Sequence, residues 1–486
     1  MTLNLPHLTP QKKKKRPWPI ALRLVLGLLL LILIGTGLLM VPAASSGDPL
    51  PFMDAFFTAT SALTVTGLTV QTTSQAFTLF GHLTLLVLIQ IGGVGYMFAI
   101  SLILLLLRRG LTFRDRLTLT ASLGLDKPGA IFLVLRRSFW GILIIEAVGA
   151  LLLYFHWRAN GIVAEDRVLL FAVFHAVSAF CNAGFDLFAG LPAYPDGIPA
   201  DNVSLLIMGT LIFIGGLGIP VLSELLNLKK IQQLHLHKAP KSKKKNLVTF
   251  VSSWLTGWHW PHFSLHTRLT LRVVVLLVLV GWLGLFLPEI RPDGVLHGLP
   301  TSNQLMRSLF QSLSARTAGF PGLADFDMLQ NESQLLIMTL MFIGCAPASM
   351  GGGITTGTFG VLLLNLRSYV LGLPEVRWGQ RTIAPGIVRR AGVVLTISIG
   401  LVIFATWLIL MTHRLPLNTV LFEVISAFAT CGLSLGITGE LNLFGRMVII
   451  VLMLWGRLGA LTLVMALAAN GESKTNIHYP PEKVLI

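Results

Sequence analysis

The chain has 486 residues, of which 54% are hydrophobic and only 12% charged, and its mean hydropathy is +0.76. A soluble domain of this size needs more polar residues to cover its surface, so the composition excludes a soluble globular protein and indicates a membrane protein. The net charge of +16 would suit nucleic acid, but the basic residues lie between apolar runs, so we expect no nucleic acid partner. Three isolated cysteines exclude a disulfide framework and a zinc knuckle.

Eight apolar runs are long enough to cross about 30 Å of hydrocarbon, which takes roughly 20 helical residues. They lie at 18–41, 78–107, 131–155, 203–228, 269–288, 334–365, 386–411 and 444–470. Four shorter apolar stretches, of about 12 to 14 residues, are typical of re-entrant half-helices. These lie at 50–62, 167–180, 302–315 and 417–428. The pattern is a span, a half-helix, a loop and a span, four times over.

The predicted fold is therefore an all-α integral membrane protein with eight transmembrane spans. Four tandem repeats of helix, re-entrant pore helix-loop and helix surround a pseudo-fourfold pore. The expected divisions are a basic N-terminus (1–17), repeat 1 (18–126), repeat 2 (127–246), repeat 3 with an intramembrane loop (247–380), repeat 4 (381–470) and a tail (471–486).

Basic residues predict the orientation, because 29 of the 37 Lys and Arg lie in the two terminal segments and the three connections between repeats. That side is expected to be cytoplasmic and to hold both termini. We interpret the runs Lys12 to Arg16 and Lys241 to Lys245 as topology signals that also attract anionic membrane lipids. The linker near 229–266 holds His235, His237, His259, His262 and His266; metal binding is one reading and a solvated or interfacial loop the other.

Four strings, each at the end of a half-helix, align on one glycine. They read SALTVTGL (61–68), SAFCNAGF (178–185), LSARTAGF (313–320) and SAFATCGL (426–433). The aligned glycines are Gly67, Gly184, Gly319 and Gly432. One such string would indicate no more than a turn, whereas four copies at matching positions indicate an internal fourfold repeat.

Backbone carbonyls from four converging loops can replace the hydration shell of a potassium ion without a fixed charge that would trap it. Glycine serves this geometry because it lacks a Cβ and lets four backbones approach closely. The predicted filter consists of Thr64, Val65, Thr66, Gly67, Cys181, Asn182, Ala183, Gly184, Arg316, Thr317, Ala318, Gly319, Ala429, Thr430, Cys431 and Gly432. Cys181 and Cys431 are interpreted as packing residues. The Arg316 side chain is expected to point away from the pore and tie down its loop.

A second repeated signal lies in the spans after the loops: IGGVG (91–95), IGGLG (214–218) and WGRLG (455–459). Arg457 stands where the first two strings have Gly93 and Gly216. An arginine deep in an apolar run usually faces the protein interior or a wet cavity, so Arg457 is predicted to hinder cations just inside the filter. The alternative is a buried ion pair with Glu146, Glu224 or Glu423.

In the third repeat the span is interrupted by IGCAPASMGGGITTGTF (343–359), which cannot sustain a regular helix. Irregular backbone at membrane depth is tolerated only where protein or a water-filled cavity satisfies its polar groups, so we expect a movable plug at the pore. A simple kink is the alternative. With Arg457, the predicted gate consists of Ala346, Pro347, Ala348, Ser349, Met350, Gly351, Gly352, Gly353, Ile354, Thr355, Thr356, Gly357 and Thr358.

These motifs together resemble the Trk/Ktr/HKT superfamily of potassium transporters over about residues 18 to 470, and most closely a KtrB-type membrane subunit. The resemblance implies that the four glycines are filter glycines, that Ala346 to Thr358 forms the gate loop and that Arg457 is the barrier arginine. A glycine at position 67 resembles the potassium-selective members. Thr355 stands where the family often has lysine. The resemblance also implies a homodimer that sits on a cytoplasmic ring of nucleotide-binding regulatory subunits, similar to KtrA or TrkA.

The function expected from the sequence is potassium uptake across a prokaryotic plasma membrane, with potassium as the transported ion and symport with sodium left open. The alternative is a sodium-conducting or non-selective relative of the same architecture. We expect no enzyme, because His82, His156 and His175 are scattered without evident partners and no HExxH or GxSxG occurs. We expect no nucleotide bound by this chain, because no phosphate-binding glycine motif opens a helix after a strand.

Overall fold

A computed structural model describes residues 20–94, 131–194, 197–226, 263–323, 326–379 and 381–459. Several predicted features lie outside these residues. They are the basic N-terminus, the cytoplasmic connection at 95–130, the linker at 227–262 with its lysine run and four of its five histidines, and the tail beyond 459.

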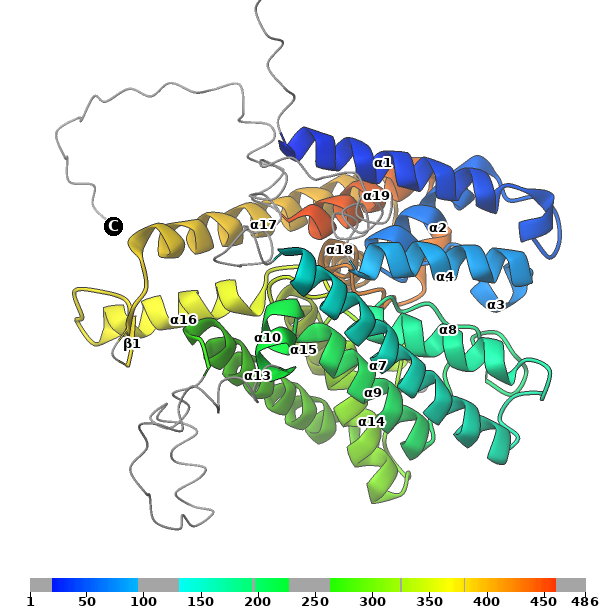
Figure 1. The fold of residues 1–486 in the computed structure, drawn as a ribbon, viewed down its shortest axis with the longest axis horizontal. Coiled ribbons are helices and arrows are strands. Elements are labelled where there is room, and N and C mark those ends of the chain that lie inside the picture. The colour runs from blue at the N-terminus through cyan, green and yellow to red at the C-terminus, as the bar shows by residue number, and fades with distance from the viewer. Residues whose placement is uncertain are drawn as a thin grey trace, which may run out of the picture.

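The described part of the chain is almost entirely helical (Figure 1). In chain order its α-helices are α1 (Ile20–Leu39), α2 (Phe52–Thr64), α3 (Thr73–Ala76), α4 (Leu79–Val94), α7 (Ile131–Ala159), α8 (Val168–Cys181), α9 (Asn202–Gly216), α10 (Ile219–Leu226), α13 (Leu265–Glu289), α14 (Thr301–Ser314), α15 (Asn331–Phe342), α16 (Thr356–Val370), α17 (Pro385–Thr412), α18 (Leu417–Ala429) and α19 (Leu443–Leu458). Short elements are η1 (Pro42–Ala44), η3 (Phe326–Met328), η4 (Ile437–Glu440) and the hairpin of β1 (Arg377–Trp378) and β2 (Arg381–Thr382).

The four predicted half-helices are present as α2, α8, α14 and α18, within two residues of the predicted bounds. Proline stands directly before three of them, at Pro51, Pro300 and Pro416. Proline fixes φ and lacks an N–H that would be unpaired there, so it suits a helix start. These half-helices hold much of the buried core, because α2, α8 and α18 pack between the two longer helices of their own repeats and α14 packs between α13 and α9 of repeat 2.

Among the described residues, α7, α13 and α17 are long and apolar enough to cross a membrane, and the bent pair α9–α10 makes a fourth. The helices α1 and α4 are shorter in their described parts. The structure thus has a helical, membrane-type architecture, and the number of eight spans stays a prediction.

The second repeat differs from the continuous span expected at 203–228, because α9 and α10 meet at an angle of 102°. Gly218, in the junction, has φ +83°, which is left-handed and suits glycine. Pro220 has no N–H to bond the carbonyl of Gly216 four residues earlier, so the helix cannot continue through this point. The break therefore follows from Gly218 and Pro220, which a prediction based on hydropathy alone does not take into account.

The break predicted in the third repeat is present between α15 and α16. The backbone is non-helical from Ile343 to Thr355, and Ile343 and Ile354 pair side by side in a parallel bridge. The predicted gate segment extends three residues too far, because Thr356, Gly357 and Thr358 form the first turn of α16. Thr355 ends the loop as an N-cap, since its hydroxyl accepts a hydrogen bond from the Thr358 N–H.

The repeats close into a ring in which the last meets the first. Helix α19 of repeat 4 packs against α2 of repeat 1 (Figure 1). Arg446 Nη1 donates to Asp54 Oδ1 at 2.6 Å across this junction, with both side chains largely buried. The centre of the ring is the place where the four half-helices end.

Candidate ion pathway

Every half-helix ends in the same unusual backbone pattern. Two residues before each aligned glycine stands a non-glycine residue in the left-handed region, and the glycine is left-handed too. The φ values are 58° at Val65, 57° at Asn182, 70° at Thr317 and 50° at Thr430, and 92°, 68°, 79° and 96° at Gly67, Gly184, Gly319 and Gly432. Left-handed non-glycine residues cost of order 1–3 kcal/mol and cluster at functional sites.

The four loops touch one another in a closed ring. A Cβ placed on Gly67 would lie 2.5 Å from the Ala183 carbonyl oxygen and 3.0 Å from Gly184 Cα. Gly184 abuts Gly319 in the same way, Gly319 abuts the Cys431 carbonyl, and Gly432 abuts the Thr66 carbonyl. Repeats 1, 2, 3 and 4 therefore follow one another around the ring, with repeats 1 and 3 opposite, as are repeats 2 and 4. Such close approach of four backbones requires glycine.

Serine side chains hold each loop onto its own half-helix. Ser61 Oγ accepts from the Gly67 N–H at 3.0 Å, and Ser426 Oγ accepts from the Gly432 N–H at 3.0 Å. In the other two repeats the hydroxyl donates to a carbonyl one residue after the glycine, from Ser178 to Phe185 at 2.9 Å and from Ser314 to Phe320 at 2.6 Å. In each repeat the serine of the half-helix therefore fixes the chain at or directly after the aligned glycine.

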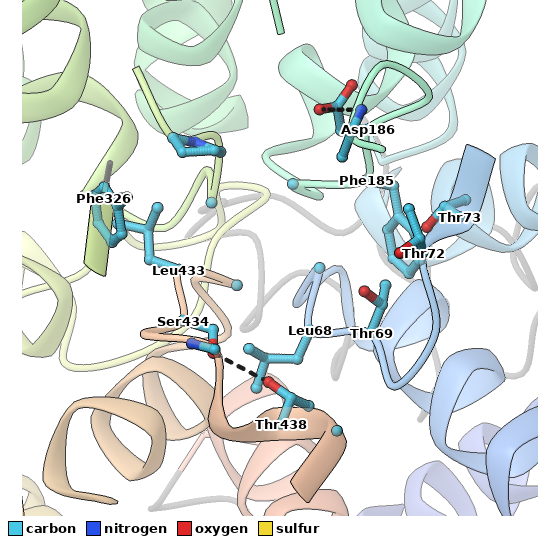
Figure 2. Close-up of a pocket in the computed structure, with 18 of the residues that line it drawn as sticks. Leu68, Thr69, Thr72, Thr73, Phe185, Asp186, Phe326, Leu433, Ser434 and Thr438 are labelled. Atoms are coloured by element: carbon cyan, nitrogen blue, oxygen red, sulfur yellow. Dashed lines mark hydrogen bonds between the residues drawn. The ribbon is translucent and has the colours of Figure 1, made fainter. Parts of the chain in front are cut away.

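A cavity of about 580 Å³ lies over the ring. Figure 2 shows loops from all four repeats converging on it. All four glycines line it, together with hydroxyl-bearing residues such as Thr72 and Ser434 and the carboxylate of Asp186. This polar vestibule opens on the side from which the half-helices enter, which the sequence predicts to be extracellular.

The non-helical segment of repeat 3 lies on the other side of the ring. A Cβ on Gly352 would lie 2.5 Å from Thr430 Oγ1, and one on Gly351 would overlap Thr317 Oγ1. Both threonines are the left-handed residues that stand two positions before aligned glycines. The glycine run that broke the helix therefore sits directly beneath the predicted filter, where a side chain would not fit.

Backbone hydrogen bonds tie this segment to the break in repeat 2. The Ala346 N–H donates to the Gly216 carbonyl at 3.1 Å, and the Ile219 N–H donates to the Ala348 carbonyl at 3.1 Å. The first of these bonds occupies the acceptor that Pro220 leaves open. The two irregular segments satisfy each other's polar groups, which is the condition for irregular backbone inside a membrane.

Cys345 fixes the start of the same segment under the filter. Its Sγ lies 3.0 Å from the Arg316 carbonyl, 3.3 Å from Thr317 Oγ1 and 3.5 Å from Asn182 Nδ2. The Arg316 side chain is buried and its Nη2 lies 3.4 Å from the Gly344 carbonyl oxygen. Arg316 thus contacts the base of the segment, and its expected orientation away from the pore stays a prediction. Cys345 carries a contact role that the sequence analysis did not assign to it.

Arg457 joins three repeats below the ring. Its guanidinium donates to the Met350 carbonyl in the repeat 3 segment and to the Gly92 carbonyl in repeat 1, and lies 3.3 Å from the Gly93 carbonyl. The position therefore faces the protein interior, as expected of an arginine in an apolar run.

The first glycine of each repeated string in the later spans has a packing role. Gly92, Gly215 and Gly456 lie against the carbonyls of Leu63, Phe180 and Phe428, so close that a Cβ would overlap the oxygen. These carbonyls belong to the last turns of α2, α8 and α18. The repeated glycines therefore let each later helix support the end of its half-helix.

Two histidines for which the sequence indicates no partner, His175 and His156, each contact an aspartate that is buried or half-buried. His175 Nε2 lies 2.9 Å from Asp186 Oδ1, and His156 Nε2 lies 2.7 Å from Asp201 Oδ2.

Two of the three candidate counterions for Arg457 have other partners. Glu146 accepts hydrogen bonds from Gln90 and Cys181, and Glu423 accepts from the hydroxyls of Ser434 and Thr438 beside the fourth loop. No cluster of His, Cys, Asp and Glu that could hold a metal ion occurs within the described residues.

Known proteins are similar to this chain in sequence and in fold. The TrkH family model, described as cation transport protein, matches residues 24–479. The chain is 33% identical over 470 residues to the Ktr system potassium uptake protein B of Bacillus subtilis, which covers 95% of each chain. It is 31% identical over 491 residues to the potassium/sodium uptake protein NtpJ of Enterococcus hirae, covering 98% of this chain and 99% of the relative. The crystal structure of the potassium transporter TrkH from Vibrio parahaemolyticus has the same fold, with a TM-score of 0.67 and 20% identity, covering 94% and 86% of the two chains.

Proposed function

Because the chain belongs to the TrkH family of cation transport proteins, we propose that it takes up potassium through the ring of four loops. Family membership places the chain among membrane transport proteins rather than enzymes. The observation that carries the proposal is the closed contact of four glycines, each preceded two residues earlier by a second left-handed residue. Left-handed residues at alternate positions turn successive carbonyls to one side, as rings of carbonyl ligands require.

The proposed filter runs from the last helical residue of each half-helix to its glycine in repeats 1, 2 and 4. In these repeats it comprises Thr64 to Gly67, Cys181 to Gly184 and Ala429 to Gly432. In repeat 3 it comprises Arg316 to Gly319, which follow the end of α14. The half-helices direct their partly negative C-terminal ends at the ring, which favours a cation there.

The proposed gate is the non-helical segment Ile343 to Thr355 together with Arg457. Support comes from its place beneath Thr317 and Thr430 and from the arginine that bonds its Met350 carbonyl to repeat 1. Because Arg457 is positively charged, it opposes a cation that has left the filter. Opening requires this segment to exchange the Arg457 contact for other partners.

Sodium conduction is the second candidate, since the Enterococcus hirae relative is named a potassium/sodium uptake protein. Gly67 favours potassium, because the potassium-selective members of the superfamily resemble this chain in having glycine there. Which ion passes depends on the spacing of the carbonyl ligands in the open protein, and symport with sodium stays open. The same proposal includes a homodimer and a cytoplasmic nucleotide-binding ring, which the resemblance supports. It also includes cytoplasmic termini, which the basic connections of the sequence support.

Cation flux through the purified chain in liposomes tests the proposal. Vesicles that differ only in an outward potassium or sodium gradient are compared, and we expect flux with potassium and little with sodium. Equal flux would contradict potassium selectivity. Flux with neither ion, even after addition of a cytoplasmic regulatory ring, would contradict the role of the four loops.

A further inference from the structure

The four repeats differ at one pair of positions behind the filter. Nine residues before each filter glycine lies a buried position on the half-helix, and two residues after it lies a position at the vestibule. These pairs are Thr58 and Thr69, His175 and Asp186, Phe310 and Pro321, and Glu423 and Ser434. Only in repeats 2 and 4 does the half-helix carry an ionisable side chain at this position.

In repeat 2 the pair is a direct contact. His175 is fully buried, and its Nε2 lies 2.9 Å from Asp186 Oδ1, while its Nδ1 lies 2.8 Å from the Phe171 carbonyl oxygen. Asp186 also accepts from the N–H of Phe188 at 2.7 Å and of Ala189 at 3.2 Å, so one carboxylate orders the chain that leaves the filter. The Leu187 N–H lies 3.3 Å from His175 Nε2.

In repeat 4 a carboxylate takes the place of the histidine. Glu423 has no exposed surface, and its Oε2 accepts from Ser434 Oγ at 2.7 Å while its Oε1 accepts from Thr438 Oγ1. Ser434 Oγ in turn accepts from the Gly436 N–H at 3.0 Å. The His175–Asp186 and Glu423–Ser434 contacts thus both join the half-helix to the chain just outside the filter. Figure 2 shows Asp186 and Ser434 on opposite sides of the vestibule.

The other two repeats are held differently. In repeat 3 the half-helix has Phe310 at the corresponding position, and the neighbouring Gln311 Oε1 accepts from the Gly322 N–H at 2.8 Å. In repeat 1 the corresponding position is Thr58, whose short side chain is buried. Buried ionisable groups are costly unless they are hydrogen-bonded, and in these two opposite repeats their partners lie on the chain directly after the aligned glycine.

We propose that His175 and Glu423 are positioning residues that hold opposite sides of the filter, at Gly184 and Gly432, and so set how strongly it prefers potassium to sodium. The proposal rests on the selective filter proposed above. Neither side chain contacts the ion. Each acts through the residue that leaves its filter loop, Asp186 in repeat 2 and Ser434 in repeat 4.

The test compares selectivity, because loss of a merely structural contact would lower protein yield or stability without changing the ion ratio. Potassium and sodium fluxes are measured in liposomes for Glu423→Leu and for His175→Phe, which copies the residue of repeat 3. We expect the potassium-to-sodium flux ratio to fall about fivefold or more, with potassium flux retained. Glu423→Gln keeps an oxygen acceptor for one hydroxyl and offers its NH2 as a donor to the oxygen of the other, so it should keep most of the ratio. Thr58→Val is the matched control in repeat 1 and should leave the ratio unchanged.

A double variant tests whether Glu423 acts through Ser434. If it does, Ser434→Ala lowers the ratio alone but adds little in the Glu423→Leu background, because contacts that share one path are not additive. Size-exclusion profiles and melting temperatures select variants that fold; if His175→Phe does not fold, His175→Gln replaces it.

The outcomes separate the two proposals. A wild-type chain that passes sodium as well as potassium would overturn the selective filter and this role with it. A selective wild-type chain whose folded His175 and Glu423 variants keep the wild-type ratio would overturn the positioning role alone.

Discussion

Gly67 stands where a left-handed backbone and a neighbouring loop leave no room for a side chain. Its φ is +92°, and the carbonyl of Ala183 occupies the place that a Cβ would take. Any other residue would have to move one loop away from the next. Because the ring is closed, that displacement changes the distances among carbonyls from two repeats.

We predict that Gly67→Ser lowers the potassium-to-sodium flux ratio about tenfold. Backbone strain of order 1–3 kcal/mol at this position is enough to change relative ion binding by such a factor. The measurement is paired flux in liposomes. Gly37→Ser is the matched control, because Gly37 lies in α1 and no atom lies within 4 Å of the place that a Cβ would take. Unchanged discrimination in Gly67→Ser would place the first loop outside the filter.

Arg457 offers a separate test of the barrier. We predict that Arg457→Ala raises basal potassium flux several-fold, because it removes a positive charge and the contacts to the Met350 and Gly92 carbonyls. Arg457→Lys keeps the charge but not the planar guanidinium that reaches two carbonyls, so its flux should lie between that of the wild type and that of Arg457→Ala. Equal flux in all three folded proteins would remove Arg457 from the barrier.

The sequence predicts the position of a residue in the fold well where the same motif occurs in all four repeats. The half-helices and the close approach of the aligned glycines are predictable because the same string occurs before each later span. The broken helix at Gly351 to Gly353 is predictable because glycine and proline cannot sustain a helix. Contacts between repeats were not predicted. The contact of Cys345 with Asn182 joins repeats 3 and 2, whose approach depends on how the ring closes. Within repeat 2, the pairing of His175 with Asp186 depends on the path of the loop that separates them.

The bend between α9 and α10 shows how two irregular elements depend on each other. An apolar run of this length reads as one helix, but Gly218 and Pro220 break it. The backbone groups at the break bond the repeat 3 segment: its Ala346 N–H donates to the Gly216 carbonyl, and its Ala348 carbonyl accepts from the Ile219 N–H. The proposed gate is therefore anchored on repeat 2 as well as on its own repeat.

We predict that Pro220→Ala raises basal potassium flux. The substitution supplies an N–H that competes with Ala346 for the Gly216 carbonyl, so α9 can continue and the segment loses one of its two backbone anchors. Flux in liposomes measures the effect. Pro385→Ala is the control, because Pro385 is the first residue of α17, where an added N–H meets no internal acceptor. A Pro220→Ala protein with wild-type flux would show that this anchor does not restrain the gate.

The molecule as a whole depends on closure of the ring between repeats 1 and 4, which are far apart in sequence. Arg446 and Asp54 meet there at 2.6 Å with side chains 19% and 13% exposed. Arg291 and Glu332 form an ion pair of nearly the same length, 2.7 Å, within repeat 3, but with side chains 58% and 50% exposed. The two pairs differ in solvent access and in what they connect. Arg446 also donates to the Leu441 and Gly439 carbonyls and Asp54 accepts from Gln71, so a double-mutant cycle is needed to isolate the coupling within each pair.

We predict a coupling of about 1–3 kcal/mol between Asp54 and Arg446, because a hydrogen-bonded pair shielded from water loses more when one partner is removed. The exposed pair should couple by about 0.2–1 kcal/mol, since solvent screens it. The measurement is thermal unfolding of the detergent-solubilised chain for Asp54→Asn, Arg446→Gln and the double variant, with Glu332→Gln, Arg291→Gln and their double variant as the control cycle. Because a single break between repeats 1 and 4 opens the whole ring, Arg446→Gln should also lower the potassium-to-sodium flux ratio, whereas Arg291→Gln should not. Equal coupling in the two cycles, with selectivity intact in both, would mean that packing of α2 against α19 closes the ring without this ion pair.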